Sequence, residues 1–191
     1  VELEDLRMAH MQLGFETSYD NDMLHTVAYV SFQELATRIS HRNTGKISDD
    51  PICEQMLTRV SLDENLHMLF YRNLLGAALD MEPNASMRAI ADVVTDFKMP
   101  GHELPGFGRK SVQIALAGIY DLPQHLDDVI APVLRAWNIY ERNDLTGDGL
   151  KARDEIVEFL ANAKKDSNRF EERREVHFER LIARGQNPIR I

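Results

Sequence analysis

Three side chains that could hold a metal ion lie in two apolar stretches of the sequence. Glu64 and His67 are three residues apart, a spacing that places both on one face of a helix, one turn from each other. Such a pair can bind one ion, and Glu-x-x-His is the unit that supplies ligands in carboxylate-bridged di-metal bundles. Glu34 lies in a second apolar row, and a single Glu facing a Glu-x-x-His pair makes half of such a ligand set. These three residues are therefore candidates for part of a metal site.

The case for metal depends on where the acids lie relative to the apolar positions of the same helix. Asp63, Glu64 and His67 fall within an apolar line that consists of Ile52, Met56, Val60, Phe70, Tyr71 and Leu74. Burial of an unpaired carboxylate costs several kcal/mol, so an acid on a core face usually has a cation, a proton or a hydrogen-bonding network beside it. The spacing alone would equally suit a surface pair or a satisfied core pair. The expected burial, together with Glu34, is what favours metal.

The other histidines carry weaker signals. His41 lies one turn beyond Thr37 near a helix end, where a cation interacts favourably with the helix dipole, and we expect a structural role there. His102 falls in a segment rich in Pro and Gly, where a histidine is usually exposed. The remaining four are expected to face solvent or to cap helices: His10, His25, His125 and His177.

The composition restricts the class of protein. A length of 191 residues fits one domain with a single sizeable core. With 22 Lys and Arg against 31 Asp and Glu, the net charge is −9, which lacks the broad positive field that nucleic-acid binding requires. No apolar run approaches the roughly 18 residues of a membrane span. The single cysteine, Cys53, excludes an internal disulfide and suits a reducing, cytoplasmic compartment.

The elements that must position these residues are all expected to be helices, because apolar residues recur every three or four positions and alternating β-branched runs are missing. Asp20 or Asp22 can cap the second helix, and Asp50-Pro51 begins the third. The expected spans are about 1–15, 20–45, 50–79, 86–98, 109–120, 123–140 and 150–181, with a candidate break near Lys164 and a loop over 99–106. The second and third helices are both long enough to be bundle helices. The predicted fold class is therefore an all-α, four-helix-type bundle.

Two segments resemble the soluble acyl-[acyl-carrier-protein] desaturases, and the bacterial members most closely. Residues 29–44 resemble the family's segment Tyr-x-Ser-Phe-Gln-Glu-x-Ala-Thr-x-Ile-Ser-His-x-Asn-Thr. Residues 63–67 read Asp-Glu-Asn-Leu-His and resemble its second Asp-Glu-x-x-His motif, at the family's distance. The resemblance continues through 99–102, 145–147 and 171–173, so it covers nearly the whole chain and implies a ferritin-like, di-iron carboxylate bundle. The chain departs from the family at Arg42, which replaces a glycine, and at Leu66 and Met68, which replace charged residues.

The resemblance implies roles for five residues. Glu34 would be a carboxylate ligand or bridge, Glu64 a bridging carboxylate, and His67 a nitrogen ligand of two iron ions. Thr37 matches the family's threonine beside the oxygen-binding face, and Asp63 matches an acid proposed to orient a ligand histidine and to lie on the electron path. In the family, a further Glu and a Glu-Glu-x-x-His motif come earlier in the chain. We therefore expect this sequence to be the C-terminal portion of a longer chain, lacking the N-terminal helices, with the ligand set completed upstream of its first residue.

The expected organisation is a single helical domain over 1–191, with bundle helices over about 1–98 and accessory C-terminal helices over about 109–183. The reaction that the resemblance implies is oxygen-dependent formation of a double bond in a fatty acyl chain on acyl-carrier protein, within fatty acid biosynthesis. A ferredoxin-like electron donor and a homodimer are also implied. The carrier is acidic, so a local positive patch is needed, for which Arg38, Arg42 and Lys46 are candidates, although a solvated helix end explains them equally well. Two alternatives stay open: a ferritin-like di-iron oxidase, and a metal-free helical binding or scaffold protein of the same fold.

Overall fold

The computed structural model describes residues 3–13, 17–19, 22–186 and 188, and within them every regular element is a helix. The helices are α1 (Leu3–Leu13), α2 (Met23–Ile47), α3 (Pro51–Met81), α4 (Pro83–Thr95), α5 (Phe107–Leu116), α6 (Leu122–Gln124), η1 (His125–Ile130), α7 (Ala131–Ala136), η2 (Ile139–Glu141) and α8 (Gly147–Ala183). The predicted all-α class is confirmed. The cap at Asp20 and the side chain of His10 lie outside the described residues. No helix among those described combines the length and the apolar character needed to cross a bilayer.

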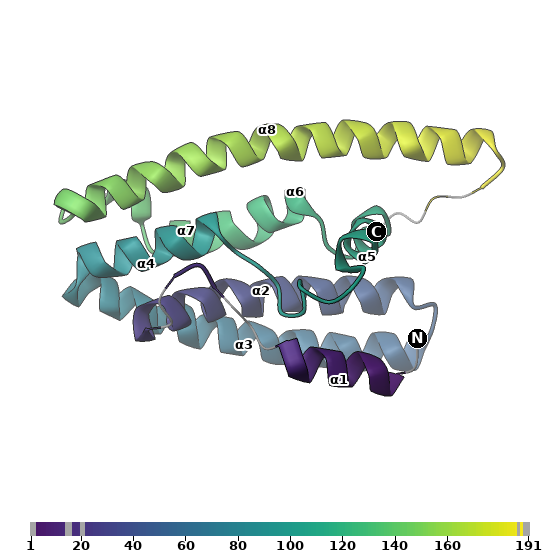
Figure 1. Ribbon diagram of the computed structural model, residues 1–191, viewed down its shortest axis with the longest axis horizontal. Coiled ribbons are helices and arrows are strands. Elements are labelled where there is room, and N and C mark those ends of the chain that lie inside the picture. Colours follow the sequence, from purple (N-terminus) through teal and green to yellow (C-terminus); the bar gives the residue numbers. More distant parts are fainter. Residues whose placement is uncertain (1–2, 14–16, 20–21, 187, 189–191) are drawn as a thin grey trace.

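The long helices α2 and α3 form an antiparallel hairpin (Figure 1). Asp22 caps α2 by accepting a hydrogen bond from the backbone N–H of His25, and Asp50 caps α3 in the same way. The two helices approach closely at Gly45, where an added Cβ would lie 3.3 Å from both the Cα of Glu54 and the Cβ of Leu57. This hairpin carries all the residues singled out as metal ligands.

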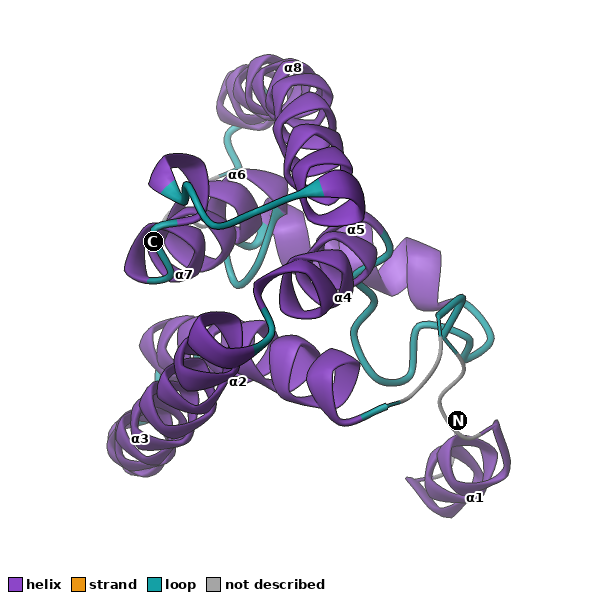
Figure 2. Ribbon diagram, turned by 90° about the vertical axis from the view of Figure 1, so that its left-hand side faces the viewer, coloured by secondary structure: helices purple, strands orange, loops and turns teal. Residues whose placement is uncertain are grey.

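The core lies between the hairpin and α8, with α4 in the middle (Figure 2). Phe32 of α2 meets the Trp137 ring edge-on, with centroids 5.5 Å apart, and the indole N–H of Trp137 donates to the backbone carbonyl of Arg72 at 2.7 Å. Arg88 of α4 joins α8 by an ion pair with Glu155 at 2.6 Å. The large side chains that are fully buried come from the hairpin, from α4, from the segment between η1 and η2, and from α8. They include Phe32, Leu75, Leu79, Met87, Ile90, Ile130, Leu134, Ile139 and Ile156.

The helix predicted over 123–140 is interrupted. Residues 125–130 form a π-helical turn in which the N–H of Ala131 bonds to the carbonyl of Leu126, five residues back. Pro132 accounts for the wider turn, because it has no N–H to offer the carbonyl of Asp128 and its ring needs room beside that group. In contrast, α8 is continuous, so the candidate break near Lys164 is wrong.

The apolar line predicted to face inward on α3 is largely exposed, which corrects the sequence interpretation. Ile52 is 77% exposed and Phe70 63%, and Met56 and Leu74 are also exposed. The side of α3 that is buried instead presents Ser61, Met68, Leu75 and Leu79. The periodicity correctly indicated a helix but did not indicate which side of it packs against α2.

His25, predicted to face solvent or cap a helix, has a buried ring. Its Nδ1 lies 2.9 Å from an oxygen of Asp22 and its Nε2 3.1 Å from an oxygen of Asp92, and the ring stacks on Tyr19 with centroids 5.1 Å apart. His125 is also largely covered, with Nδ1 2.8 Å from the hydroxyl of Tyr120. His25 thus joins α2 to α4, and the His125 ring packs on that of Phe97 with centroids 4.8 Å apart, which their local spacing did not reveal.

Candidate metal centre

Glu34, Glu64 and His67 meet on the α2–α3 hairpin. One ligand atom from each lies within 4.8 Å of those of the other two. His67 Nδ1 is 3.2 Å from Glu64 Oε2 and 3.4 Å from Glu34 Oε2. The structure thus brings together the three residues that the sequence singled out, while their role as ligands stays a prediction.

The hairpin explains why these side chains converge. Glu64 and His67 are one turn apart on α3, so their side chains lie one above the other. Glu34 projects from α2, which runs antiparallel to α3 beside it. The polar atoms therefore come from two rigid helices, and their separation is set by backbone packing rather than by a flexible loop.

The two carboxylates of the cluster are mostly buried, and each affects the other's pKa. The side chains of Glu34 and Glu64 are 15% and 18% exposed, whereas that of His67 is 56% exposed. Burial and the neighbouring Glu64 carboxylate raise the pKa of Glu34 to about 7. The hydrogen bond from Glu34 lowers the pKa of Glu64, and hydrogen bonds to Glu64 and Glu34 raise the pKa of His67. The raised pKa of Glu34 reflects the closeness of the Glu64 carboxylate, and a cation bound between the two groups would offset their repulsion.

His41 belongs to the same cluster, although sequence reasoning gave it a structural role at the helix end. Its Nε2 lies 3.6 Å from Glu64 Oε1, on the other side of that carboxylate from His67. The signal was available, because His41 follows Glu34 by seven residues and so lies on the same side of α2. Glu64 is therefore flanked by two imidazoles.

Thr37 and Asp63, the two residues expected to act beside the metal, have other partners here. The Thr37 hydroxyl donates to the backbone carbonyl of Glu34 at 2.9 Å and is half-buried next to the cluster. Asp63 pairs with Arg59 on its own helix at 3.2 Å and is partly exposed. Thr37 thus lies beside the candidate ligands, and Asp63 lies one residue away from them with its charge neutralised.

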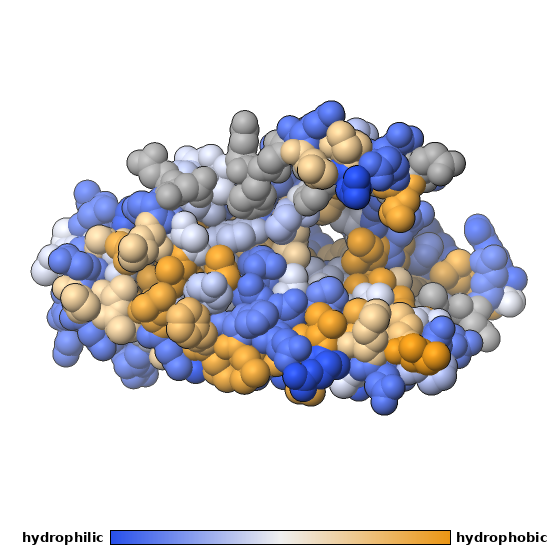
Figure 3. All heavy atoms as spheres, turned by 90° about the horizontal axis from the view of Figure 1, so that it is seen from below, coloured by the Kyte–Doolittle hydropathy of each residue, from blue (hydrophilic) through white to orange (hydrophobic). Residues whose placement is uncertain are grey.

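The outward side of the cluster opens onto an exposed apolar surface of α3. Figure 3 looks at the molecule from below and shows hydrophobic side chains recurring along its length among hydrophilic ones. The exposed apolar residues of α3 are Ile52, Met56, Leu62, Leu66, Phe70, Leu74 and Met81. Exposed apolar side chains that recur along one helix in this way mark a surface suited to contact with another protein element.

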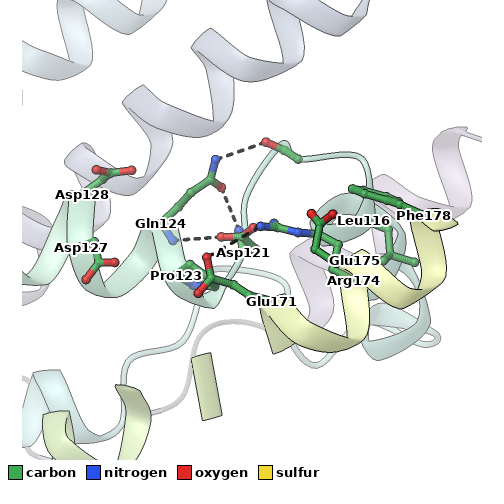
Figure 4. Close-up of a pocket in the computed structure, with 11 residues that line it drawn as sticks. Leu116, Asp121, Pro123, Gln124, Asp127, Asp128, Glu171, Arg174, Glu175 and Phe178 are labelled. Atoms are coloured by element: carbon green, nitrogen blue, oxygen red, sulfur yellow. Dashed lines mark hydrogen bonds and ion pairs between the residues drawn. The ribbon is translucent and has the colours of Figure 1, made fainter. Parts of the chain in front are cut away.

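A separate cavity of about 440 Å³ lies between α8 and the segment that carries α6 and η1 (Figure 4). Arg174 of α8 crosses it to pair with Asp121, which also caps α6. Lys164 pairs with Asp127 at 2.8 Å. The acids that line the cavity are Asp121, Asp127, Asp128, Glu171 and Glu175. None of them belongs to the metal cluster, and the ion pairs here tie α8 to α6 and η1.

Comparison with known families identifies the class of protein. The family described as "Fatty acid desaturase" matches residues 1–183, and the chain belongs to this family. A solved structure of the acyl-ACP desaturase homologue DesA2 from Mycobacterium tuberculosis H37Rv has a TM-score of 0.60 and 25% identity, covering 70% of this chain and 53% of that one. The fold is accordingly the ferritin-like helical bundle of these proteins.

Curated relatives carry the same family name. The provisionally named acyl-[acyl-carrier-protein] desaturase DesA1 of Mycobacterium tuberculosis (strain CDC 1551 / Oshkosh) is 43% identical over 193 residues, covering 97% of this chain and 57% of that protein. The chloroplastic stearoyl-[acyl-carrier-protein] 9-desaturase of Gossypium hirsutum is 25% identical over 186 residues, covering 92% of this chain and 44% of that protein. The chain thus spans about half the length of the curated relatives that it matches.

Proposed function

We propose that this chain is the catalytic part of a di-iron acyl-[acyl-carrier-protein] desaturase, an oxidoreductase of fatty acid biosynthesis. The observation that carries the proposal is the convergence of Glu34, Glu64 and His67 within 4.8 Å on two packed helices. The names of its relatives support the class of substrate. Membership of the family supports the class of reaction.

The donor set fits iron. Carboxylate oxygens and a neutral imidazole nitrogen are ligands that iron accepts, and the raised pKa of Glu34 indicates that the two carboxylates repel each other without a cation between them. With oxygen as the oxidant and electrons from an external donor, two bound iron ions would supply the redox chemistry needed to remove two hydrogens from an unactivated carbon chain. Glu64 would bridge, Glu34 would bind or bridge, and His67 would contribute a nitrogen.

The chain's own residues also prepare the site. The helix backbones hold the carboxylates in place before an ion binds. Little side-chain conformational entropy would therefore be lost when the ion binds. The Thr37 hydroxyl, held against the backbone of α2, is positioned beside the ligand face. Asp63 would orient a ligand histidine or lie on the electron path once its pairing with Arg59 is exchanged.

A di-iron pair needs more donors than these three. Further Glu and His ligands would lie on helices that cover the exposed apolar face of α3, since that face borders the cluster. Covering this face would exclude water from the acyl chain and would bury Phe70 and Leu66. The proposed unit is one helical domain in which 1–98 supplies bundle helices and 109–183 supplies accessory helices.

The proposed partners are acyl-carrier protein with its bound fatty acyl chain and a ferredoxin-like electron donor. A homodimer in the cytoplasm is the proposed setting. Neither nucleic acid nor a lipid bilayer is needed for this reaction, which takes place on a carrier-bound chain.

The proposal is tested by analysing acyl chains on acyl-carrier protein by mass spectrometry after incubation with the protein as expressed from its own gene, an electron donor and oxygen. We expect a product two hydrogens lighter, and its loss in the double variant Glu64→Ala with His67→Ala. The matched control, Glu179→Ala with His177→Ala on α8, removes the same residue types and should keep the activity. A double bond formed at an unchanged rate by the cluster variant would refute the site assignment.

A further inference from the structure

Three cations follow one another along the second half of α2 at four-residue intervals. Arg38, Arg42 and Lys46 line one groove of about 460 Å³, whose opposite wall is formed by Gln124 and Asp128. At 1.5 Å per residue, each step of four residues is about 6 Å, so the row is about 12 Å long. The groove is lined by α2 on one side and by the α6–η1 segment on the other.

The charge in this groove is opposite in sign to that of the whole chain, which is −9. Asp128 is the one carboxylate among the residues that line the groove. Arg42 has an ion pair with Glu54 at 3.3 Å, whereas Arg38 and Lys46 have no ion-pair partner within the part of the chain that the structure describes. Both of these side chains are exposed. Two of the three cations are thus available to a partner.

Hydrogen bonds hold the groove open. Asn43 of α2 donates to the backbone carbonyl of Ile119 at 3.0 Å, which fixes α2 relative to the segment before α6. Gln124 forms a capping box with Asp121, and Arg174 of α8 in turn holds Asp121 (Figure 4). Because both walls are fixed before any partner arrives, less conformational entropy is lost on binding.

The length of the row selects the kind of partner. A single phosphate is small enough to be bound by one or two of these cations and would leave the rest unused. An acidic helix presents carboxylates at the same four-residue spacing, so one helix could place carboxylates against Arg38 and Lys46 at once, with a third beside Arg42. Arginine in particular matches a carboxylate with two parallel hydrogen bonds.

We infer that Arg38, Arg42 and Lys46 form the docking surface for an acidic helix of acyl-carrier protein. The inference rests on the proposed function, from which the identity of the partner comes. Arg38 lies one turn beyond Glu34, about 6 Å along the axis of α2. A carrier docked on this row would therefore lie next to the part of α2 that bears the candidate ligands.

The test measures binding of purified acyl-carrier protein to the double variant Arg38→Glu with Lys46→Glu by titration calorimetry at low salt. We expect the dissociation constant to rise about tenfold or more, because two attractive contacts become repulsive. The control variant, Lys151→Glu with Arg180→Glu on α8, changes the net charge equally and should bind within about twofold of the unaltered chain. Reversing the facing carboxylates of the carrier to lysine should restore binding to the first variant.

Comparing two forms of the carrier separates the contribution of its acidic helix to binding from that of its phosphate group. Apo-carrier, which has no phosphopantetheine arm, should lose affinity in the variant as much as the holo-carrier does. An effect seen with the holo-carrier alone, an equal loss in the control variant, or no loss at all would each overturn the inference. Iron content measured on the same samples distinguishes failure of the docking proposal from failure of the proposed di-iron function. The variant Arg38→Glu with Lys46→Glu leaves the cluster intact, so it should contain as much iron as the unaltered protein.

Discussion

The interior around α4 and the outward face of α3 have similar sequence patterns but different surroundings. Met87, Ile90 and Val94 of α4 follow helical spacing and are fully buried between α2 and α8. Ile52 and Phe70 of α3 also follow helical spacing, yet both are mostly exposed. Apolar periodicity therefore identifies a face that an element should cover, but it does not identify the covering element. The ionisable residues on the second face distinguish it, because a stable core seldom contains unpaired acids.

The largest expected effect is on the free energy of unfolding, and it is tested at two neighbouring leucines of α3. Leu75 is completely buried and Leu74 is exposed, so Leu75→Ala leaves a cavity and Leu74→Ala does not. We expect Leu75→Ala to lower the free energy of unfolding by about 2–5 kcal/mol and Leu74→Ala by less than about 1 kcal/mol. Urea unfolding followed by circular dichroism measures both. Equal losses would show that the two faces of α3 are covered alike, and the comparison would fail.

A smaller effect is expected from pH on the packed region. Burial lowers the pKa of His125 from 6.5 to about 4, so between these values the unfolded chain binds a proton that the folded chain does not. Stability should therefore fall as the pH drops from 7 to 4, by up to about 3 kcal/mol from this group. His125→Gln, whose amide can still form a hydrogen bond with the Tyr120 hydroxyl, should reduce this dependence. An unchanged pH profile in the variant would exclude His125 as its cause.

The smallest effect concerns the start of α3. Asp50 accepts hydrogen bonds from the backbone N–H groups of Ile52 and Cys53, so Asp50→Ala should lower stability by about 1 kcal/mol. Asp50→Asn keeps an acceptor and serves as the matched control. Because this cap lies at the exposed end of α3, its loss should leave near-UV signals from the buried Trp137 unchanged. A change in those signals would mean that the uncovered face and the core are more strongly coupled than the structure indicates.

Local chemistry made parts of the fold predictable. Asp50-Pro51 combines a side-chain acceptor with a residue that needs no N–H, and the third helix begins there as predicted. The Glu64 and His67 pairing follows from helical geometry alone. In contrast, the π-turn before Pro132 and the burial of His25 between Asp22 and Asp92 depend on packing between distant segments, which no local pattern encodes.

The candidate site was predictable in its members but not in its surroundings. The sequence indicated that Glu34 and the α3 pair would meet, because two adjacent long helices bring their matching faces together. It did not indicate that His41 would approach Glu64, since the position near the end of α2 suggested an interaction with the helix dipole. Nor did it indicate that Phe70 would be exposed, because exposure depends on which elements cover α3.

The most direct measurement is the iron content of the protein as expressed from its own gene and purified without chelators. The account predicts two iron ions per chain, and their loss when either Glu34→Ala or His67→Ala removes a donor. Glu172→Ala, on the exposed surface of α8, should leave the content unchanged. Iron retained at two per chain in both cluster variants, or absent from the unaltered protein, would contradict the assignment of Glu34, Glu64 and His67 as ligands.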